Sequence, residues 1–289
     1  MPEAPGAFRV LYRDFLFRVL DLELLPAVDD IERLLGQFAA MLAAFSFTFA
    51  VFGLPKYIAS SLPHERLAIL ARSEEEFLIA TTMTIAGLFA VLAWNNVLPA
   101  RRDCLVLGVL PIRVRTVFLA KAAALATALA VGVFAVNVFT GFVFPWLVAG
   151  SGFGGAMQSL AAYWMAAGAA GLFVFCALVA LEGAAAQMLP HRLFLRMSAA
   201  LQFCAFFAIL GGYMLKPSFP NFAPPTLAHA WEAWLPSFWF FALFQLLNGA
   251  RDPLFHALAL RGLWALAAVF GAAAVSFGLA YARAVRNIN

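Results

Sequence analysis

Charged residues are scarce in this chain of 289 amino acids. Asp, Glu, Lys and Arg make up 12% of it, whereas 64% of the residues are hydrophobic and 15% are aromatic. A soluble domain usually has about 25% charged residues, so this chain has too few polar side chains to cover a water-exposed surface of its size. With a mean hydropathy of +0.90, the composition excludes a soluble enzyme and a disordered chain and indicates a protein embedded in lipid.

Cysteine is also rare. The odd count of three, Cys104, Cys176 and Cys204, excludes a disulfide scaffold and leaves packing as their default role. The formal net charge of +4 is too small and too dispersed for a nucleic-acid-binding surface, so no nucleic-acid partner is expected. Arg, Asp or Glu interrupts the first 25 residues every few positions, which argues against a cleavable signal peptide.

Catalytic and metal-binding motifs are missing as well. The chain contains no HExxH, no GxSxG and no P-loop lysine motif. The glycine-rich segment 150–155 lacks that lysine and is expected to form a flexible turn. The histidines do not combine with other ligand residues at metal-binding spacing; they are His64, His191, His229 and His256. We therefore expect no enzyme activity, no cofactor and no metal in this chain.

Long apolar runs, in contrast, are abundant. A membrane-spanning helix needs about 20 mostly apolar residues, and six segments qualify: 34–54, 77–98, 117–148, 160–181, 197–215 and 262–282. The first two begin after acidic residues, which suit a helix N-terminus, and end at Pro55 and Pro99. The sequence therefore predicts an all-α, polytopic membrane protein with six transmembrane helices.

The distribution of Lys and Arg predicts the orientation. If the N-terminus is cytoplasmic, 13 of the 19 basic residues fall in cytoplasmic segments, as the positive-inside rule requires. We expect a single transmembrane domain over residues 1–289, with both termini in the cytoplasm. It would consist of an interfacial region (1–33), a six-span bundle (34–282) and a short cytoplasmic tail (283–289).

Residues 8–25 show a helical amphipathic pattern. Apolar residues recur every three or four positions, and Asp14 and Arg18 form an i,i+4 pair. The apolar face consists of Phe8, Leu11, Phe15, Val19 and Leu22. Such a helix is expected to lie in the cytoplasmic interface. It could serve as a surface anchor or have a mechanical role.

The connection between the second and third spans has an unusual pattern. After Pro99 come Arg101, Arg102 and Asp103, then a short apolar segment (104–110), Pro111, and the basic residues Arg113, Arg115 and Lys121. A short amphipathic element between basic residues suits docking into a cleft of a partner. Alternatively, these charges only set the topology.

The segment between the fifth and sixth spans is far longer than a turn. It is rich in proline and aromatic residues, and its apolar run 238–247 is too short to cross a bilayer. We expect outer-leaflet or re-entrant helices here. The tryptophans Trp231, Trp234 and Trp239 would form an interfacial belt or lipid-facing anchors.

Few polar groups are expected deep in the spans. Lys121 and Glu182 are placed at cytoplasmic span ends, so no buried acid is predicted for ion coupling. Asn137 and Gln202 are the clearest deep polar residues; each could form a hydrogen bond between helices or line a substrate path. An ATPase-independent channel or carrier is the alternative function, and a membrane-embedded enzyme is a weaker one.

Together these features resemble the permease subunit of a type-2 ABC transporter, an exporter class with a G-subfamily-like fold. The resemblance covers nearly the whole chain. It is most specific in WNNVLPARRDCLVLGVLPIRVRTVFLAK (94–121) and extends to LPSFWFFALFQLLNGARDPL (235–254). In this family a loop like 94–121 contains the coupling helix that docks on the ATPase.

The resemblance implies an ATP-driven exporter in a bacterial cytoplasmic membrane. The implied ATPase contacts are Arg101, Arg102, Asp103, Leu110, Pro111, Arg113 and Arg115. ATP and Mg would bind to a separate ATPase subunit. A second permease, in a homodimer or heterodimer, would complete the pore, unless the chain is half of a fused protein. The substrate is left open among lipids, hydrophobic drugs and peptides.

Overall fold

The computed structural model describes residues 6–20, 31–58, 64–94, 114–148, 152–214 and 232–286. Within these ranges all regular elements are helices, and no strand occurs. The α-helices are α1 (Ala7–Leu20), α2 (Ile31–Ile58), α3 (His64–Leu92), α6 (Val114–Asn137), α7 (Thr140–Val148), α8 (Phe153–Met188), α9 (His191–Met214), α10 (Pro236–Leu247) and α11 (Pro253–Arg286). A short 3-10 helix, η1 (Glu232–Trp234), precedes α10.

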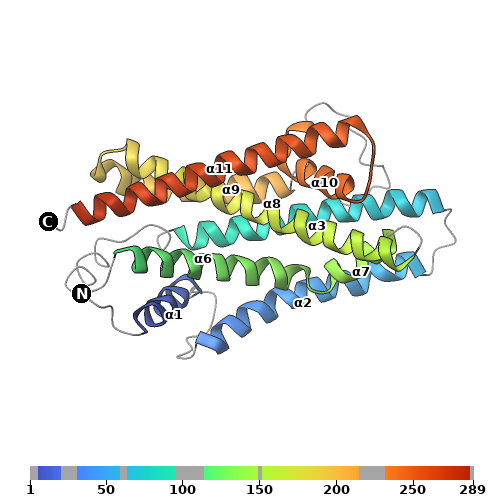
Figure 1. The fold of residues 1–289 in the computed structure, drawn as a ribbon, viewed down its shortest axis with the longest axis horizontal. Helices are drawn as coiled ribbons and strands as arrows, with labels where there is room; N and C mark the ends of the chain where they lie inside the picture. The colour runs from blue at the N-terminus through green and yellow to red at the C-terminus, as the bar shows by residue number, and fades with distance from the viewer. Residues whose placement is uncertain are drawn as a thin grey trace.

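Six of these helices are long and apolar enough to cross a membrane, which confirms the predicted all-α class and number of spans. The apolar stretches are Glu32–Gly53, Ala71–Leu92, Arg115–Asn137, Phe153–Met188, Met197–Met214 and Pro253–Leu279. The six helices run alternately in opposite directions, so that α1 and the C-terminal end of α11 lie at the same end of the bundle (Figure 1). An even number of passes requires this arrangement.

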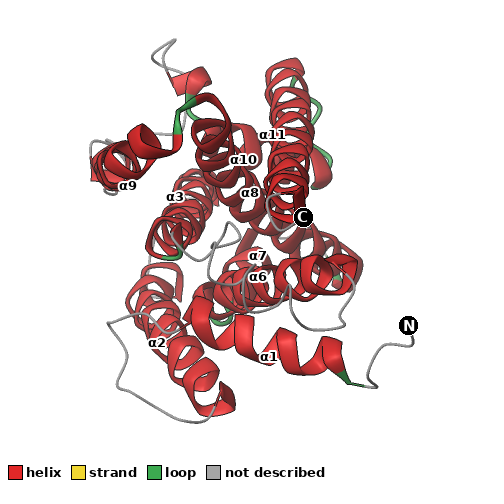
Figure 2. Cartoon of the chain, turned by 90° about the vertical axis from the view of Figure 1, so that its left-hand side faces the viewer, coloured by secondary structure: helices red, strands yellow, loops and turns green. Residues whose placement is uncertain are grey.

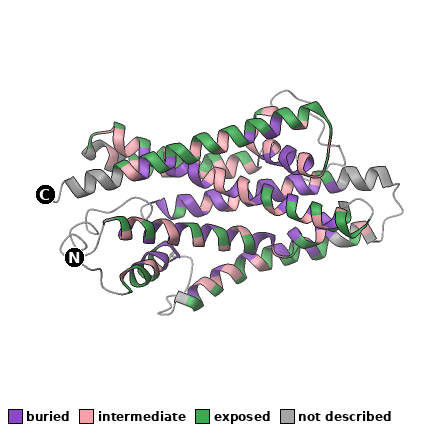
Figure 3. Cartoon of the chain, in the orientation of Figure 1, coloured by how far each residue is buried: buried purple, intermediate pink, exposed green. Residues whose placement is uncertain are grey.

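Burial follows the pattern expected for a bundle in an apolar solvent. Buried side chains face the neighbouring helices, while the outer faces of α2 and α11 are exposed (Figure 3). Many of those outer side chains are large and apolar, such as Phe52 of α2, at 74% exposed, and Trp264 of α11, at 75%. A soluble protein rarely exposes so much contiguous apolar surface, so the outer surface suits lipid.

The third predicted span, 117–148, is not one helix. It breaks at Val138 and Phe139 into α6 and α7. The backbone N–H groups of Phe139 and Thr140 donate to the Oγ of Ser46 on α2, at 3.1 and 3.2 Å. A helix start leaves its first N–H groups without intrahelical acceptors. The Ser46 hydroxyl supplies that acceptor, which sequence periodicity could not reveal.

The fourth predicted span, 160–181, is shorter than the helix that the structure contains. The helix α8 has 36 residues, begins at Phe153 and continues to Met188, so Gly154 and Gly155 are helical and not part of a flexible turn. At 1.5 Å per residue, α8 is about 54 Å long, well beyond the bilayer core of about 30 Å. Near its end, a Cβ on Gly183 would collide with the side chain of Ser276 on α11. Gly183 therefore allows the close approach of α8 and α11.

The short apolar helix α10 lies inside the bundle. Phe240, Phe241 and Phe244 have no exposed surface and pack with residues of α3, α8 and α11. A turn with Gly249 at a φ of +89° then connects α10 to α11. The prediction of an apolar helix too short to span is confirmed. The phenylalanines of this run fill the protein core.

The tryptophans of the predicted interfacial belt lie in different environments. Trp234 is 73% exposed, with the guanidinium of Arg261 at 5.3 Å from its ring centroid. Trp239 is half-buried and donates its Nε1–H to the carbonyl of Ala233 at 2.8 Å. Trp231 lies outside the described residues.

Candidate functional site

Most of the residues predicted to contact an ATPase lie outside the described part of the chain. These are Arg101, Arg102, Asp103, Leu110, Pro111 and Arg113. Arg115 is described: it lies in the first turn of α6 and is exposed. The structure also describes both ends of the connection, at Trp94 and Val114.

The end of α3 is attached to α9. Trp94 is 1% exposed and donates its Nε1–H to the Ser198 hydroxyl at 3.0 Å. One turn earlier, the Nε2 of Gln202 donates to the carbonyl of Val91 at 2.9 Å. Gln202 thus forms a hydrogen bond between α9 and α3. A displacement of the connection at residue 94 would therefore be transmitted to α9.

The beginning of α6 is attached to α1. Figure 2 shows α1 lying across the bundle, transverse to the spans and beside α6 and α2. Its apolar face buries Leu11, Phe15, Leu16, Val19 and Leu20. The predicted face is correct for Leu11, Phe15 and Val19, whereas Phe8 is 44% exposed and Leu22 lies outside the described residues.

Polar contacts reinforce this attachment. The Tyr12 hydroxyl donates to Thr127 on α6 at 3.1 Å, and the Lys121 Nζ lies 5.6 Å from the centre of the Phe15 ring. On the outer side of α1, the predicted pair forms an ion pair, with Arg18 at 2.9 Å from Asp14. The helix α1 is therefore joined to the bundle, beside the point where the second connection enters α6.

Lys121 and Glu182, which were predicted at the cytoplasmic ends of their spans, are both buried. Lys121 is 3% exposed on α6, and Glu182 is 4% exposed on α8. The charge of Lys121 acts on the Glu182 carboxyl. The two side chains thus place an amine of α6 and a carboxyl of α8 in the buried region between these helices.

Asn137 is the centre of a buried hydrogen-bond network. The Tyr163 hydroxyl of α8 donates to the Asn137 Oδ1 at 2.6 Å, and the Asn137 Nδ2 donates to the Thr82 hydroxyl of α3 at 2.9 Å. The same Nδ2 donates to the carbonyl of Val133 at 2.9 Å. All three side chains are at most 1% exposed. The network joins three spans at the C-terminal end of α6.

A group of three buried acids was missed by the sequence analysis. Glu74, Glu75 and Glu76 were interpreted as the acidic residues that open the second span, but α3 begins at His64 and all three residues are buried. One signal was present in the sequence. Consecutive residues point about 100° apart around a helix, so three acids in a row cannot all face away from a bundle.

The three acids differ in their partners. The Tyr57 hydroxyl donates to the Glu74 carboxylate at 2.7 Å. Burial and this hydrogen bond raise the pKa of Tyr57 well above its usual range, so the phenol stays protonated and remains a donor. Glu75 is completely buried, and neither of its carboxyl oxygens has a hydrogen-bond partner. Glu75 also lies close enough to Tyr163 to act on it electrostatically.

In the described segments, no group of three or more His, Cys, Asp or Glu side chains could hold a metal ion. What the arrangement offers is a carboxyl in a water-poor interior, where an ionisable group marks a candidate path for protons or other cations.

Replacing Asn137 by leucine is expected to lower the free energy of unfolding by about 1–3 kcal/mol. The substitution leaves the buried Tyr163 hydroxyl without its acceptor and removes one partner of Thr82. Gln202→Leu is the matched control; it removes one hydrogen bond and is expected to cost about 0.6 kcal/mol. Denaturant unfolding in mixed micelles measures both values. An equal or larger loss for Gln202→Leu would contradict the central role of Asn137.

Comparison with known proteins adds no family to this description. No protein-family model matches the chain, and no curated protein matches its sequence.

Proposed function

We propose that this chain is the membrane-embedded permease subunit of an ATP-driven exporter of the type-2 ABC class. The observation that carries the proposal is the attachment of α1 to α6 through the contacts of Phe15 with Lys121 and of Tyr12 with Thr127, on the helix that the connection from α3 enters. Residues 95–113 enter α6 at this point, and the resemblance places the ATPase contact in that connection. A partner docked there would act on three elements at once: α1, α3 and α6.

Movement would pass from that contact into the bundle through named contacts. The end of α3 is attached to α9 through Trp94 and Gln202. The helix α6 is attached to α1 through two contacts. The Lys121 Nζ lies over the Phe15 ring, and the Tyr12 hydroxyl donates to Thr127. ATP supplies the energy on the separate ATPase subunit. The role of this chain is to convert closure of that subunit into a shift of its helices.

The path for the substrate would form between two permease chains. A void lined by residues of α2, α3, α6 and their neighbours has a volume of only about 10 Å³, no more than a single water molecule needs. The helix α9 packs on α3 and α8 and exposes Phe203 and Phe207 on its other side. That exposed face is available for a second permease, either an identical copy or a homologue.

The proposed location is a bacterial cytoplasmic membrane, with both termini on the cytoplasmic side. The positive-inside distribution supports this orientation, because 13 of the 19 basic residues fall in the segments that it assigns to the cytoplasm. The substrate class, from the apolar character of the chain, is a hydrophobic or amphipathic molecule.

Purification from the source cells in mild detergent tests the proposal. We expect a separate ATPase to co-purify in stoichiometric amount and to hydrolyse ATP in a vanadate-sensitive manner. A folded chain that purifies without any ATPase would overturn the proposal.

A proton- or cation-coupled carrier is the second candidate function. The buried, unpaired carboxyl of Glu75 favours it, because ionisable residues inside membrane spans commonly serve proton or ion pathways. The two candidates differ in their energy source. A carrier would transport its substrate in vesicles without ATP and would stop when a protonophore or ionophore collapses the ion gradient, whereas an ABC exporter would require ATP.

A further inference from the structure

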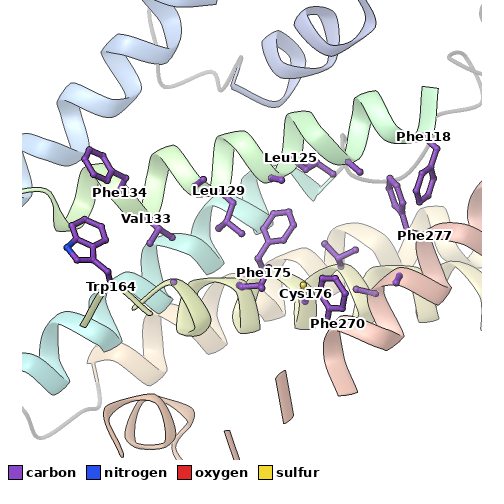
Figure 4. A pocket seen from close by; sticks show the side chains of 18 residues that line it. Phe118, Leu125, Leu129, Val133, Phe134, Trp164, Phe175, Cys176, Phe270 and Phe277 are labelled. Carbon is purple, nitrogen blue, oxygen red and sulfur yellow. The ribbon is translucent and has the colours of Figure 1, made fainter. Parts of the chain in front are cut away.

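A large apolar groove lies between α6, α8 and α11 (Figure 4). Its volume is about 720 Å³, within the usual range of about 300–1,000 Å³ for small-molecule sites. The helix α8 packs against both α6 and α11, and the groove separates those two helices from each other. Almost all of its lining is carbon; the polar exceptions are the Trp164 indole and the Cys176 thiol.

Aromatic pairs stand at both ends of the groove. At one end Phe118 of α6 contacts Phe277 of α11, with ring centroids 4.9 Å apart. At the other end Phe134 of α6 stacks on Trp164 of α8 at 5.3 Å. From Phe118 to Phe134 the rise along α6 is about 24 Å, most of the bilayer core thickness of about 30 Å. The groove is thus elongated and closed at both ends by aromatic side chains, which suits an extended hydrocarbon chain.

Small residues make the groove deep between these pairs. Ala126 of α6, Gly168 of α8 and Ala274 of α11 line it. A Cβ built on Gly168 meets no atom within 4 Å, so the space beside it is open. The lining offers a polar headgroup no partners beyond the Trp164 indole and the Cys176 thiol, so such a headgroup would lie outside the groove.

The two ends of the groove differ in the charge that they leave open: toward the end away from Phe277, Arg261 of α11 donates to the carbonyl of Ala233 at 3.1 Å and lies over the Trp234 ring. Arg115 is exposed and precedes Phe118 by three residues, so it lies on the same face of α6, about one turn further out. At the opposite end, α6 continues past Phe134 to the uncharged residues Ala135, Val136 and Asn137.

We propose that the groove binds a hydrocarbon chain of an anionic membrane lipid whose headgroup lies beside Arg115. The aromatic pairs set the length of the bound chain, and the arginine selects the charge of the headgroup. Basic sites beside transmembrane helices bind anionic headgroups in this way. The bound lipid fills the space between α6 and α11. This inference goes beyond the proposed function and does not depend on it.

Native mass spectrometry of the full chain tests the proposal. The protein is reconstituted with equal amounts of phosphatidylglycerol and phosphatidylcholine, and the lipids retained after extraction are counted. We expect one phosphatidylglycerol per chain. Gly168→Phe fills the groove and is expected to weaken retention by roughly tenfold or more, since loss of about two buried methylenes has an effect of that size.

The control is Gly271→Phe. Gly271 is also a helical glycine without an atom within 4 Å of an added Cβ, but it lies on α11 outside the groove, so retention should not change. If Gly168→Phe does not fold, Ala274→Phe fills the groove from α11, with the exposed Ala272→Phe as its control. Equal retention by a filled variant and its control would overturn the site.

Arg115→Gln tests the headgroup. We expect about fivefold weaker retention of phosphatidylglycerol and no change for phosphatidylcholine. If the wild-type chain retains both lipids equally, or if the substitution affects both equally, the anionic preference is wrong. If the filled groove leaves lipid retention unchanged but abolishes transport of an amphipathic substrate, the groove belongs to the substrate and the proposed lipid site is overturned.

Discussion

Neutralising Arg101, Arg102 and Arg113 together, each to glutamine, is expected to reduce the co-purified ATPase at least about tenfold while the chain still inserts and folds. Hydrogen bonds between charged groups and a partner contribute about 1.5–3 kcal/mol each, and every 1.4 kcal/mol changes an equilibrium tenfold. Quantitative immunoblotting of ATPase against permease measures the loss. The expectation rests on the proposed coupling contact in the connection between α3 and α6.

The matched control neutralises three basic residues at the other end of the spans: Lys56, Arg66 and Arg251. The two triple variants lose the same formal charge and differ only in the end of the bundle that they change. The control is expected to retain its ATPase. If the first variant also retains it, the connection does not dock the partner, and its charges act only on topology.

Replacing Glu75 by leucine is expected to raise the free energy of unfolding by about 1–3 kcal/mol. Both carboxyl oxygens of Glu75 are buried without a hydrogen-bond partner, and an unsatisfied buried polar group costs that much. Its electrostatic partner Arg72 is exposed, so solvent weakens the compensation. Denaturant unfolding in mixed micelles measures the gain.

Glu74→Leu is the control and is expected to lower the free energy of unfolding. Glu74 accepts a hydrogen bond from Tyr57, and its loss leaves a buried hydroxyl without an acceptor. If Glu75→Leu lowers the free energy of unfolding as Glu74→Leu does, the Glu75 carboxyl stabilises the fold, and its lack of a hydrogen-bond partner does not destabilise it.

Transport assays of the Glu75→Leu variant separate the candidate functions. A stabilised variant that has lost gradient-driven transport would support the carrier. A stabilised variant with unchanged ATP-driven transport would support the exporter.

The sequence predicted the spans because they depend on length and composition alone. Each of the six helices contains a long apolar run, and the bilayer requires such runs to be helical. The amphipathic face of α1 was predictable for the same kind of reason, since Leu11, Phe15 and Val19 recur at helical spacing.

The sequence could not show which apolar residues face protein and which face lipid. Phe244 and Phe203 are the same residue type in similar apolar runs, yet Phe244 is fully buried in α10 and Phe203 is 65% exposed on α9. In a soluble protein the periodicity would separate them. Here both environments are apolar, so hydrophobicity carries no information about the difference.

The amino-acid sequence alone determined that this is an all-helical chain with six segments able to cross a membrane, because those properties are local and set by hydrophobicity. Only the tertiary structure decided that Ser46 caps the break in the third span, that Asn137 joins three helices, that Glu75 is buried without a hydrogen-bond partner, and that α6, α8 and α11 enclose an apolar groove. These features depend on contacts between residues far apart in the chain, and such contacts exist only after the helices have packed.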